Sequence, residues 1–466
     1  MPNIANKNGI DMGNIASMNG QDIASGGAYN PVTGSGTYTE TVPSGVGLYK
    51  RGGYNTDSNP AARNLLGSNP CVMNFSSDVD GILLVNKETL TGVGLPLIQG
   101  SFQSFTNWAI DSAGKLWRVS KSSSYGGSAA TEGTNPSATE WRQVTGVTGA
   151  SDTGWTCVSC QYITSYFING GKLFVIGNNG NGQFGNGGTT ASYGAIIQVG
   201  SDTDWVWVSS GGTNAAFAIK GSSRVMYSCG TNSQGFSGQG TTSGNTTTWT
   251  AIDDTNLIGG TNENWVTMAY TCHNTVCAIQ AANSSDAFGK AFFWGYGNGS
   301  YKQFGMGSGM ASTNYDTPIL GGNVSGTPAA DWTGGCNLVG SHMLVNSSGE
   351  LWYCGYNGYG QNFSGNTTNA SSGDFIRCGS DSDWVIEPYE WGSSGQYYGG
   401  YIGGVRKTNG NLYCAGFNSY GTIIDSTTAI ISTPTLIATG VDNGKTWQAY
   451  DVAQSTGKLC WMYEVR

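Results

Sequence analysis

One short phrase recurs along most of this chain, and such a repeat limits the possible folds more than any other feature of the sequence. Residues 171–179, a Gly-Lys-Leu-Phe run that ends in Gly-Asn-Asn, return as 350–357 and as 411–418. Weaker or shorter copies lie at 47–49, 114–117, 224–230, 291–295 and 457–461. Self-similarity of this kind indicates a repeat architecture in which every unit is one supersecondary element. We call this pattern the strand phrase.

A second pattern, the tryptophan phrase, keeps step with the first. Its clearest copies are 201–206 and 380–385, both Ser-Asp-x-Asp-Trp-Val, and looser copies end at Trp155, Trp265, Trp332 and Trp447. Each unit therefore holds three or four short β-branched and aromatic runs separated by Gly, Asn and Ser, a pattern typical of strands and turns. No window keeps helical spacing over three turns. The sequence predicts an all-β protein.

The two phrases together resemble the repeat of the regulator of chromosome condensation family, a β-propeller family. That repeat has a strand ending in Gly-x-Asn, a Gly-Gln-(Leu/Phe)-Gly turn, a Val-rich strand and Gly-x-x-His. The chain matches it at 177–187, 295–305 and 355–361, whereas residues 47–55 match only the strand. His273 and His342, the only histidines, are assigned to the His position of the repeat. The resemblance covers roughly residues 45–466 and implies a β-propeller.

The number of copies predicts how the propeller closes. The strand phrase occurs eight times, but the first and last copies are incomplete. A propeller removes its free sheet edges by pairing its N-terminal and C-terminal segments in one blade. Merging the incomplete copies predicts seven blades over residues 42–466, after an extended N-terminal arm at 1–41. Six blades are the alternative if the segment 56–100 is an insertion.

Composition and charge exclude several function classes. Charged residues make up only 11% of the chain, the net charge is −9, and no run of Lys or Arg occurs. A basic surface for nucleic acid or an anionic membrane is therefore not expected. The N-terminal residues lack the pattern of a signal peptide, and the aliphatic run 82–85 is too short to cross a bilayer. We expect a soluble protein made in a cytoplasm.

Several cysteines recur at one position of the repeat. Cys229, Cys354 and Cys414 occupy nearly the same place in three units, which predicts buried free thiols. The pair Cys157-x-x-Cys160 stands alone, and this is too little for a zinc site.

The acidic pairs Asp202/Asp204 and Asp381/Asp383 lack the dense oxygen spacing of a calcium loop and fit turn chemistry. Both histidines are expected to be packing residues. No catalytic motif occurs, so we predict neither an enzyme, a metal site nor a cofactor.

The N-terminal arm carries a repeat of its own. Copies of Ile-Ala-x-x-Asn-Gly place apolar residues among turns, which cannot form a core alone but suit an arm that adds to a partner. The docking positions are Ile4, Ile10, Ile15, Met18 and Ile23. The pattern resembles N-terminal segments of tailed-phage virion proteins. This resemblance implies a virion location, other virion structural proteins as partners and multiple symmetric copies. A disordered tail is the alternative.

One segment of the propeller, 387–401, is rich in rings among small polar residues. Trp391, Tyr397, Tyr398 and Tyr401 are candidate ligand-binding residues, because Tyr and Trp offer rigid amphipathic contact area. The alternative is that these rings fill the space between blades.

The sequence thus favours a phage virion protein of the tail, baseplate or fibre, which attaches to a host-surface glycan or protein. Two alternatives stay open. One is a capsid decoration or head fibre protein without a receptor role. The other is a cellular propeller interaction module, such as an exchange factor for a small GTPase.

Overall fold

The fold is known from a computed structural model that describes most of the repeat region. Described are residues 97–102, 106–111, 113–120, 142–161, 164–211, 214–267, 270–272, 275–370, 372–386, 402–409, 411–417 and 429–438, with isolated strands nearer both ends of the chain. Regular structure in these residues is β, apart from the short 3-10 helices η2 (Ser233–Gly235) and η3 (Ile258–Gly260). None of the helical segments among them has the length and apolar character needed to cross a membrane. The all-β prediction is confirmed.

Five sheets contain four antiparallel strands each, paired in chain order. Their strands are β10 (Trp155–Gln161), β11 (Thr164–Asn169), β12 (Lys172–Gly177) and β13 (Ser192–Val199); β14 (Trp205–Gly211), β15 (Ala215–Lys220), β16 (Val225–Thr231) and β17 (Asn245–Ala251); β18 (Tyr270–Cys272), β19 (Thr275–Gln280), β20 (Lys290–Gly297) and β21 (Thr313–Leu320); β24 (Trp332–Leu338), β25 (Ser341–Asn346), β26 (Leu351–Gly355) and β27 (Ile376–Arg377); β28 (Trp384–Val385), β29 (Ile402–Lys407), β30 (Leu412–Gly416) and β31 (Ile431–Ala438). The tryptophan phrase begins the first strand of most of these sheets, and the strand phrase is the third strand.

The last sheet joins both ends of the chain. It runs through β32 (Thr446–Ala453), β33 (Leu459–Val465), β6 (Leu97–Phe102), β7 (Thr106–Asp111), β8 (Leu116–Ser120) and β9 (Arg142–Gln143). In addition β4 (Leu48–Arg51) pairs with β33, with Tyr49 opposite Met462. The predicted pairing of the C-terminal strand with the first copy of the strand phrase is therefore confirmed. The number of seven blades stays a prediction.

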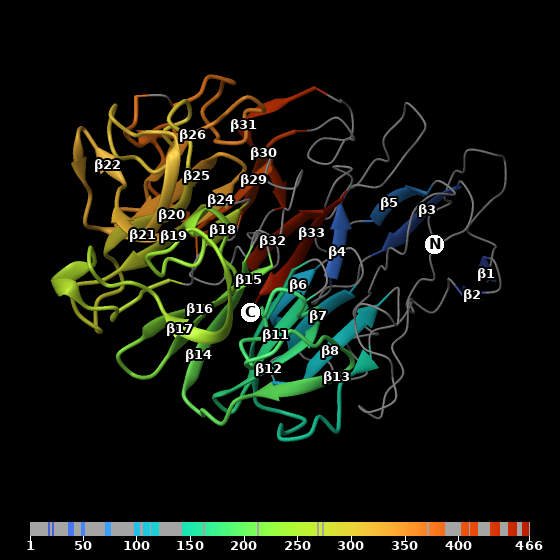
Figure 1. The fold of residues 1–466 in the computed structure, drawn as a ribbon. Coiled ribbons are helices and arrows are strands. Elements are labelled where there is room, and N and C mark those ends of the chain that lie inside the picture. Colours follow the sequence, from blue (N-terminus) through green and yellow to red (C-terminus); the bar gives the residue numbers. More distant parts are fainter. Residues whose placement is uncertain are drawn as a thin grey trace.

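The sheets follow one another around a ring (Figure 1), where red β32 and β33 lie beside blue β4 and cyan β6. First strands of successive sheets contact one another, as β10 does β14, β14 does β18, and β18 does β24. The first strand of each sheet is therefore innermost and the fourth outermost. Because the strands alternate in direction, connections between first and second and between third and fourth strands leave from one face, called here the loop face. Turns between second and third strands and links to the next sheet leave from the opposite, link face.

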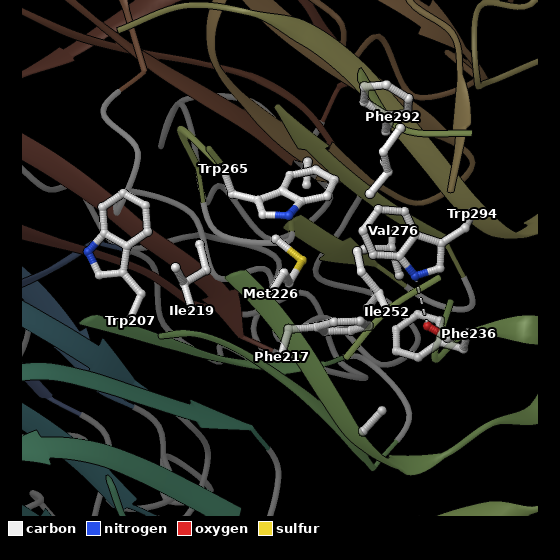
Figure 2. Packing of buried hydrophobic residues seen from close by; sticks show 13 residues of the cluster. Trp207, Phe217, Ile219, Met226, Phe236, Ile252, Trp265, Val276, Phe292 and Trp294 are labelled. Atoms are coloured by element: carbon white, nitrogen blue, oxygen red, sulfur yellow. Dashed lines mark hydrogen bonds between the residues drawn. The ribbon is translucent and has the colours of Figure 1, made fainter. Parts of the chain in front are cut away.

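The core lies between neighbouring sheets. Figure 2 shows Phe217 and Met226 of one sheet packed with Trp265 and Trp294 of the next. All four are buried, and the indole nitrogen of Trp294 donates a 3.0 Å hydrogen bond to the Phe236 carbonyl. Burial of one such large side chain contributes roughly 1.5–3 kcal/mol, so the repeat holds together through the interfaces between its units.

The Asn of Gly-x-Asn organises the loops that follow the third strands β12, β16 and β26. Asn357 is fully buried; its amide nitrogen donates to the carbonyls of Asn366 and Thr368, and its oxygen accepts from the Asn362 backbone. Asn179 makes the same pattern of contacts in its own loop. One side chain thus satisfies several backbone groups that a tight loop would otherwise leave unpaired.

These loops also connect one sheet to the next. Four glycines with positive φ donate from the backbone to the fourth strand of the following sheet or to the segment before it. They are Gly187 to Thr247 (2.7 Å), Gly240 to Asp316 (2.8 Å), Gly307 to Gly373 (2.8 Å) and Gly365 to Ser432 (2.9 Å). The glycine-rich turn of the motif therefore serves the contact between units.

Near the N-terminus, β1 (Ser17–Met18) pairs with β2 (Gln21–Asp22), and β3 (Gly36–Thr41) pairs with β5 (Pro70–Phe75). A third small pair joins β22 (Asn323–Val324) to β23 (Thr327–Pro328). None of these three sheets is joined to a blade sheet. The strand β5, within the segment 56–100, therefore pairs with the predicted arm. Of the docking positions, Met18 lies in β1, and Ile4, Ile10, Ile15 and Ile23 lie outside the described residues.

Candidate recognition face

Charge divides the propeller into two chemically different faces. On the loop face, the connections 178–191, 232–244, 298–312 and 356–375 contain two charged residues, Lys302 and Asp374. On the link face lie Asp152, Asp202, Asp204, Lys220, Asp253, Asp254, Glu263, Asp286, Asp331, Glu350, Asp381, Asp383 and Lys407, among others. The described loop face is thus almost neutral, and the link face is predominantly acidic.

The paired aspartates of the tryptophan phrase bind lysines of their own sheet. Lys407 lies 2.6 Å from Asp381 and 2.9 Å from Asp383, and its ammonium stands 4.7 Å from the centre of the Trp384 ring. The same arrangement recurs with Lys220, whose pKa is raised by its hydrogen bond to Asp202. These acids therefore form ion pairs beside the first strand of their sheet, and their role in turn formation stays a prediction. In the described part of the chain there is no group of three or more His, Cys, Asp or Glu that could hold a metal ion.

The loop face carries a row of contacting rings, called here the aromatic row: Tyr301, Tyr356, Tyr359 and Phe417. Ring centres of Tyr301 and Tyr356 lie 5.0 Å apart, those of Tyr356 and Tyr359 6.1 Å, and those of Tyr359 and Phe417 5.4 Å. The rings follow the third strands β20, β26 and β30, so the row crosses three successive sheets. All four side chains are only half-buried.

The repeat itself does not require these rings. Residues 177–183 and 355–361 align without a gap, and this alignment places Asn178 opposite Tyr356 and Asn181 opposite Tyr359. The same loop therefore folds with polar side chains at both positions. The aromatic row belongs to one sector of the ring, which favours a role in binding over a role in folding.

Buried groups hold the row in position. The amide oxygen of the buried Gln361 accepts from the Tyr359 backbone, and its nitrogen donates to the Tyr356 carbonyl at 3.1 Å. A Cβ on Gly340 would lie only 3.1 Å from both Tyr301 and Tyr356 atoms. The backbone beneath the rings is thus closely packed and preorganised.

The predicted ligand-binding residues Trp391, Tyr397, Tyr398 and Tyr401 lie outside the described residues. Their segment connects β28 to β29, a first-to-second strand connection, and Ile402 at the start of β29 pairs with Gly416, the residue before Phe417. The sequence reasoning missed the aromatic row because its members come from three units. The feature of the sequence that could have identified the row is Tyr at positions 356 and 359, where the aligned repeat unit has Asn178 and Asn181.

His342 is a packing residue, as predicted. It is completely buried, its Nδ1 shares a hydrogen bond with the Asn337 side chain, and its ring centre lies 5.0 Å from that of Phe293. Burial lowers the pKa of His342 to about 3, which keeps the imidazole neutral. The assignment of both histidines to one repeat position is wrong. His342 pairs with Cys354, the residue before Gly355, and in the preceding sheet it is Val276 that pairs with Trp294, the residue before Gly295. His273 itself lies outside the described residues.

The three predicted buried thiols, Cys229, Cys354 and Cys414, are free and buried, which confirms that prediction. Cys229 Sγ donates to the Gln183 carbonyl and Cys354 Sγ to the Lys302 carbonyl, each at 3.1 Å. Each of these two thiols therefore contacts the loop of the preceding sheet. Burial raises the pKa of Cys354 to about 12, so its thiol stays protonated.

No protein-family model and no curated protein matches the sequence. Solved structures do match the fold. Human WBSCR16 superposes with a TM-score of 0.60 at 14% identity, over 90% of this chain and 99% of that chain. Prp20p from Saccharomyces cerevisiae superposes with a TM-score of 0.55 at 10% identity, over 92% of this chain and 93% of that chain. Yeast RCC1 (Prp20), in a structure bound to Kap60, superposes with a TM-score of 0.56 at 11% identity, over 92% of this chain and 91% of that chain. The fold is that of an RCC1-type β-propeller, as predicted.

Proposed function

We propose that this protein is a non-catalytic recognition module that holds a partner against the loop face of its propeller. The observation that carries the proposal is the difference between the two faces. Among the described residues the ion pairs lie on the link face, whereas the loop-face connections carry few charges and present the half-buried aromatic row. Rings with polar tips, accessible at the surface, are the side chains that most often dominate binding energy.

The architecture supports this role because it makes the loop face rigid. Buried Asn357 and Gln361 fix the loop that carries Tyr356 and Tyr359, and Gly365 attaches the same loop to the next sheet. A preorganised surface loses little conformational entropy on binding.

The test compares variants on the two faces. Labelled full-length protein is allowed to adsorb to intact cells of candidate bacterial hosts. We expect Tyr356→Asn with Tyr359→Asn to reduce adsorption, and Asp254→Lys on the link face to leave it unchanged. Equal adsorption of the parent and the double variant, with both folded, would refute the assignment of the loop face.

Within this role we propose the virion as the place of action, with attachment to the host surface as the task. The support is the Ile-Ala-x-x-Asn-Gly repeat of the N-terminal segment, together with the separation of the β1–β2 and β3–β5 sheets from the blades. Other virion structural proteins would bind this arm, and the protein would be present in several symmetric copies. A chain lacking residues 1–30 should melt normally yet fail to enter particles; normal incorporation would count against a docking arm. Labelling of the incorporated protein in particle images separates a tail location from a capsid decoration.

A cellular interaction module is the competing candidate, and the fold likeness favours it. The structure of Prp20p is described together with binding properties to Gsp1p and histones. The decisive assay is release of a fluorescent guanine nucleotide from a small GTPase in the presence of this protein. Accelerated release would establish an exchange factor and would remove the case for the virion.

A further inference from the structure

We infer that the aromatic row is a binding site for a neutral oligosaccharide, laid across neighbouring sheets. This inference rests on the proposed recognition function of the loop face and names its ligand class.

The geometry of the rings suits an extended ligand made of several flat apolar units. Successive ring centres are 5.0, 6.1 and 5.4 Å apart, and neighbouring rings are tilted by 50° to 88°. The row is therefore a continuous stepped surface, wider than one sugar ring. Pyranose rings have an apolar C–H face that packs on aromatic faces, and a chain of them would contact several members of the row at once.

The polar groups around the row suit the edges of a sugar chain. Ser300 and the stretch 366–368, Asn-Thr-Thr, are exposed in the two loops that hold Tyr301, Tyr356 and Tyr359. Hydroxyl and amide groups both donate and accept hydrogen bonds. They therefore match vicinal hydroxyls, which also do both.

Charge selects among the ligands that stack on aromatic rings. Nucleic-acid bases would stack equally well, but the phosphate backbone needs several Lys or Arg contacts. Lys302 is the single Lys or Arg in the four connections of the loop face described above. The net charge of −9 also disfavours anionic polysaccharides. A neutral chain is the ligand whose charge fits this surface.

A proline-rich peptide is the strongest competitor, since such segments dock into aromatic grooves. The surface favours sugar because its polar partners are hydroxyl and amide groups spread along both loops.

Saturation-transfer NMR on the full-length protein tests the inference. The probes are neutral hexasaccharides of glucose, galactose and N-acetylglucosamine, with sialyllactose and decaproline as competitors of different chemistry. We expect transfer to at least one neutral hexasaccharide and little to sialyllactose or decaproline. Tyr356→Asn with Tyr359→Asn should weaken that binding about tenfold or more, as loss of an aromatic hot spot does.

The chain offers matched controls. Asn already stands at the equivalent positions 178 and 181, so the double variant should fold, as an unchanged unfolding midpoint would show. Tyr356→Phe with Tyr359→Phe keeps the rings and should retain binding within about threefold. Tyr193, exposed at 36% on another sheet, tests for nonspecific stacking, and Tyr193→Asn should change nothing.

Each contrary result has a distinct meaning. Sugar binding that survives the double Asn variant would overturn the site. Binding of decaproline in place of sugars, or of no probe at all, would overturn the ligand class. If no probe binds but cell adsorption still depends on Tyr356 and Tyr359, the recognition face stands and the carbohydrate inference fails.

Discussion

Acidification should destabilise this protein through His342, a buried histidine that the fold keeps neutral. Its pKa is about 3 in the folded chain, against about 6.5 in an unfolded one. As the pH falls, the unfolded chain therefore takes up the proton first. The contribution of neutral His342 to the free energy of unfolding is fully present above about pH 6.5, and it is lost progressively as the pH falls toward 3.

Linkage gives the size of the effect. Between pH 7.5 and pH 5.0 the free energy of unfolding should fall by about 2 kcal/mol on account of this one group. Other ionisable groups contribute to the pH dependence of the wild type, so its stability curve alone does not isolate His342. His342→Gln keeps a nitrogen that can donate to the Asn337 side chain but cannot take up a proton.

The assay is urea unfolding of the wild type and His342→Gln at both pH values. At pH 7.5 the His342→Gln variant will be less stable than the wild type. At pH 5.0 the difference between their free energies of unfolding should be smaller by about 2 kcal/mol. Proton NMR provides a direct check, since the chain has only two histidines. One imidazole signal should not shift between pH 7.5 and 4.5. The reasoning would be refuted if the difference in unfolding free energy between the two proteins were the same at both pH values. It would also be refuted if both imidazoles titrated near neutral pH.

Three further predictions follow from the repeat. Asn357→Ala removes hydrogen bonds to several backbone groups and should cost about 2–4 kcal/mol of unfolding free energy, whereas the exposed Thr367→Ala should stay within about 0.5 kcal/mol; equal effects in thermal or urea unfolding would contradict this role. A Cβ on Gly171 would stand 2.0 Å from the Thr203 carbonyl, whereas one on Gly170 meets nothing within 4 Å. Gly171→Ala should therefore cost about 3 kcal/mol or more and Gly170→Ala only about 1 kcal/mol, and the reverse order in urea unfolding would be incompatible with this packing. Deletion of 457–466 removes β33 and leaves unpaired strand edges at β32, β4 and β6, so light scattering should show association; a monomer with unchanged melting would exclude closure by this strand.

Much of the fold could be predicted from local patterns. The period of the strand phrase identified the repeat, and the absence of helical spacing identified the all-β class. Two incomplete copies at the ends indicated that β33 would pair with the first copy. The burial of Cys229, Cys354 and Cys414 followed from their common place in the strand, because strand position decides which side chains face the core.

The roles of the motif residues required the three-dimensional structure. The sequence places Asn357 after a strand, but only the folded loop shows that it binds three backbone groups there. Strand register, and not the spacing in the sequence, showed that Val276 and not His273 corresponds to His342.

By itself the sequence determined the repeat, the β class and the propeller, because these depend on order and composition within a unit. The tertiary structure decided which residues of different units meet. Tyr301, Tyr356 and Phe417 are far apart in the chain, and each looks like an ordinary loop residue when its unit is read alone. The packing of three successive sheets against one another places these loops side by side on one face, and only that arrangement forms the aromatic row.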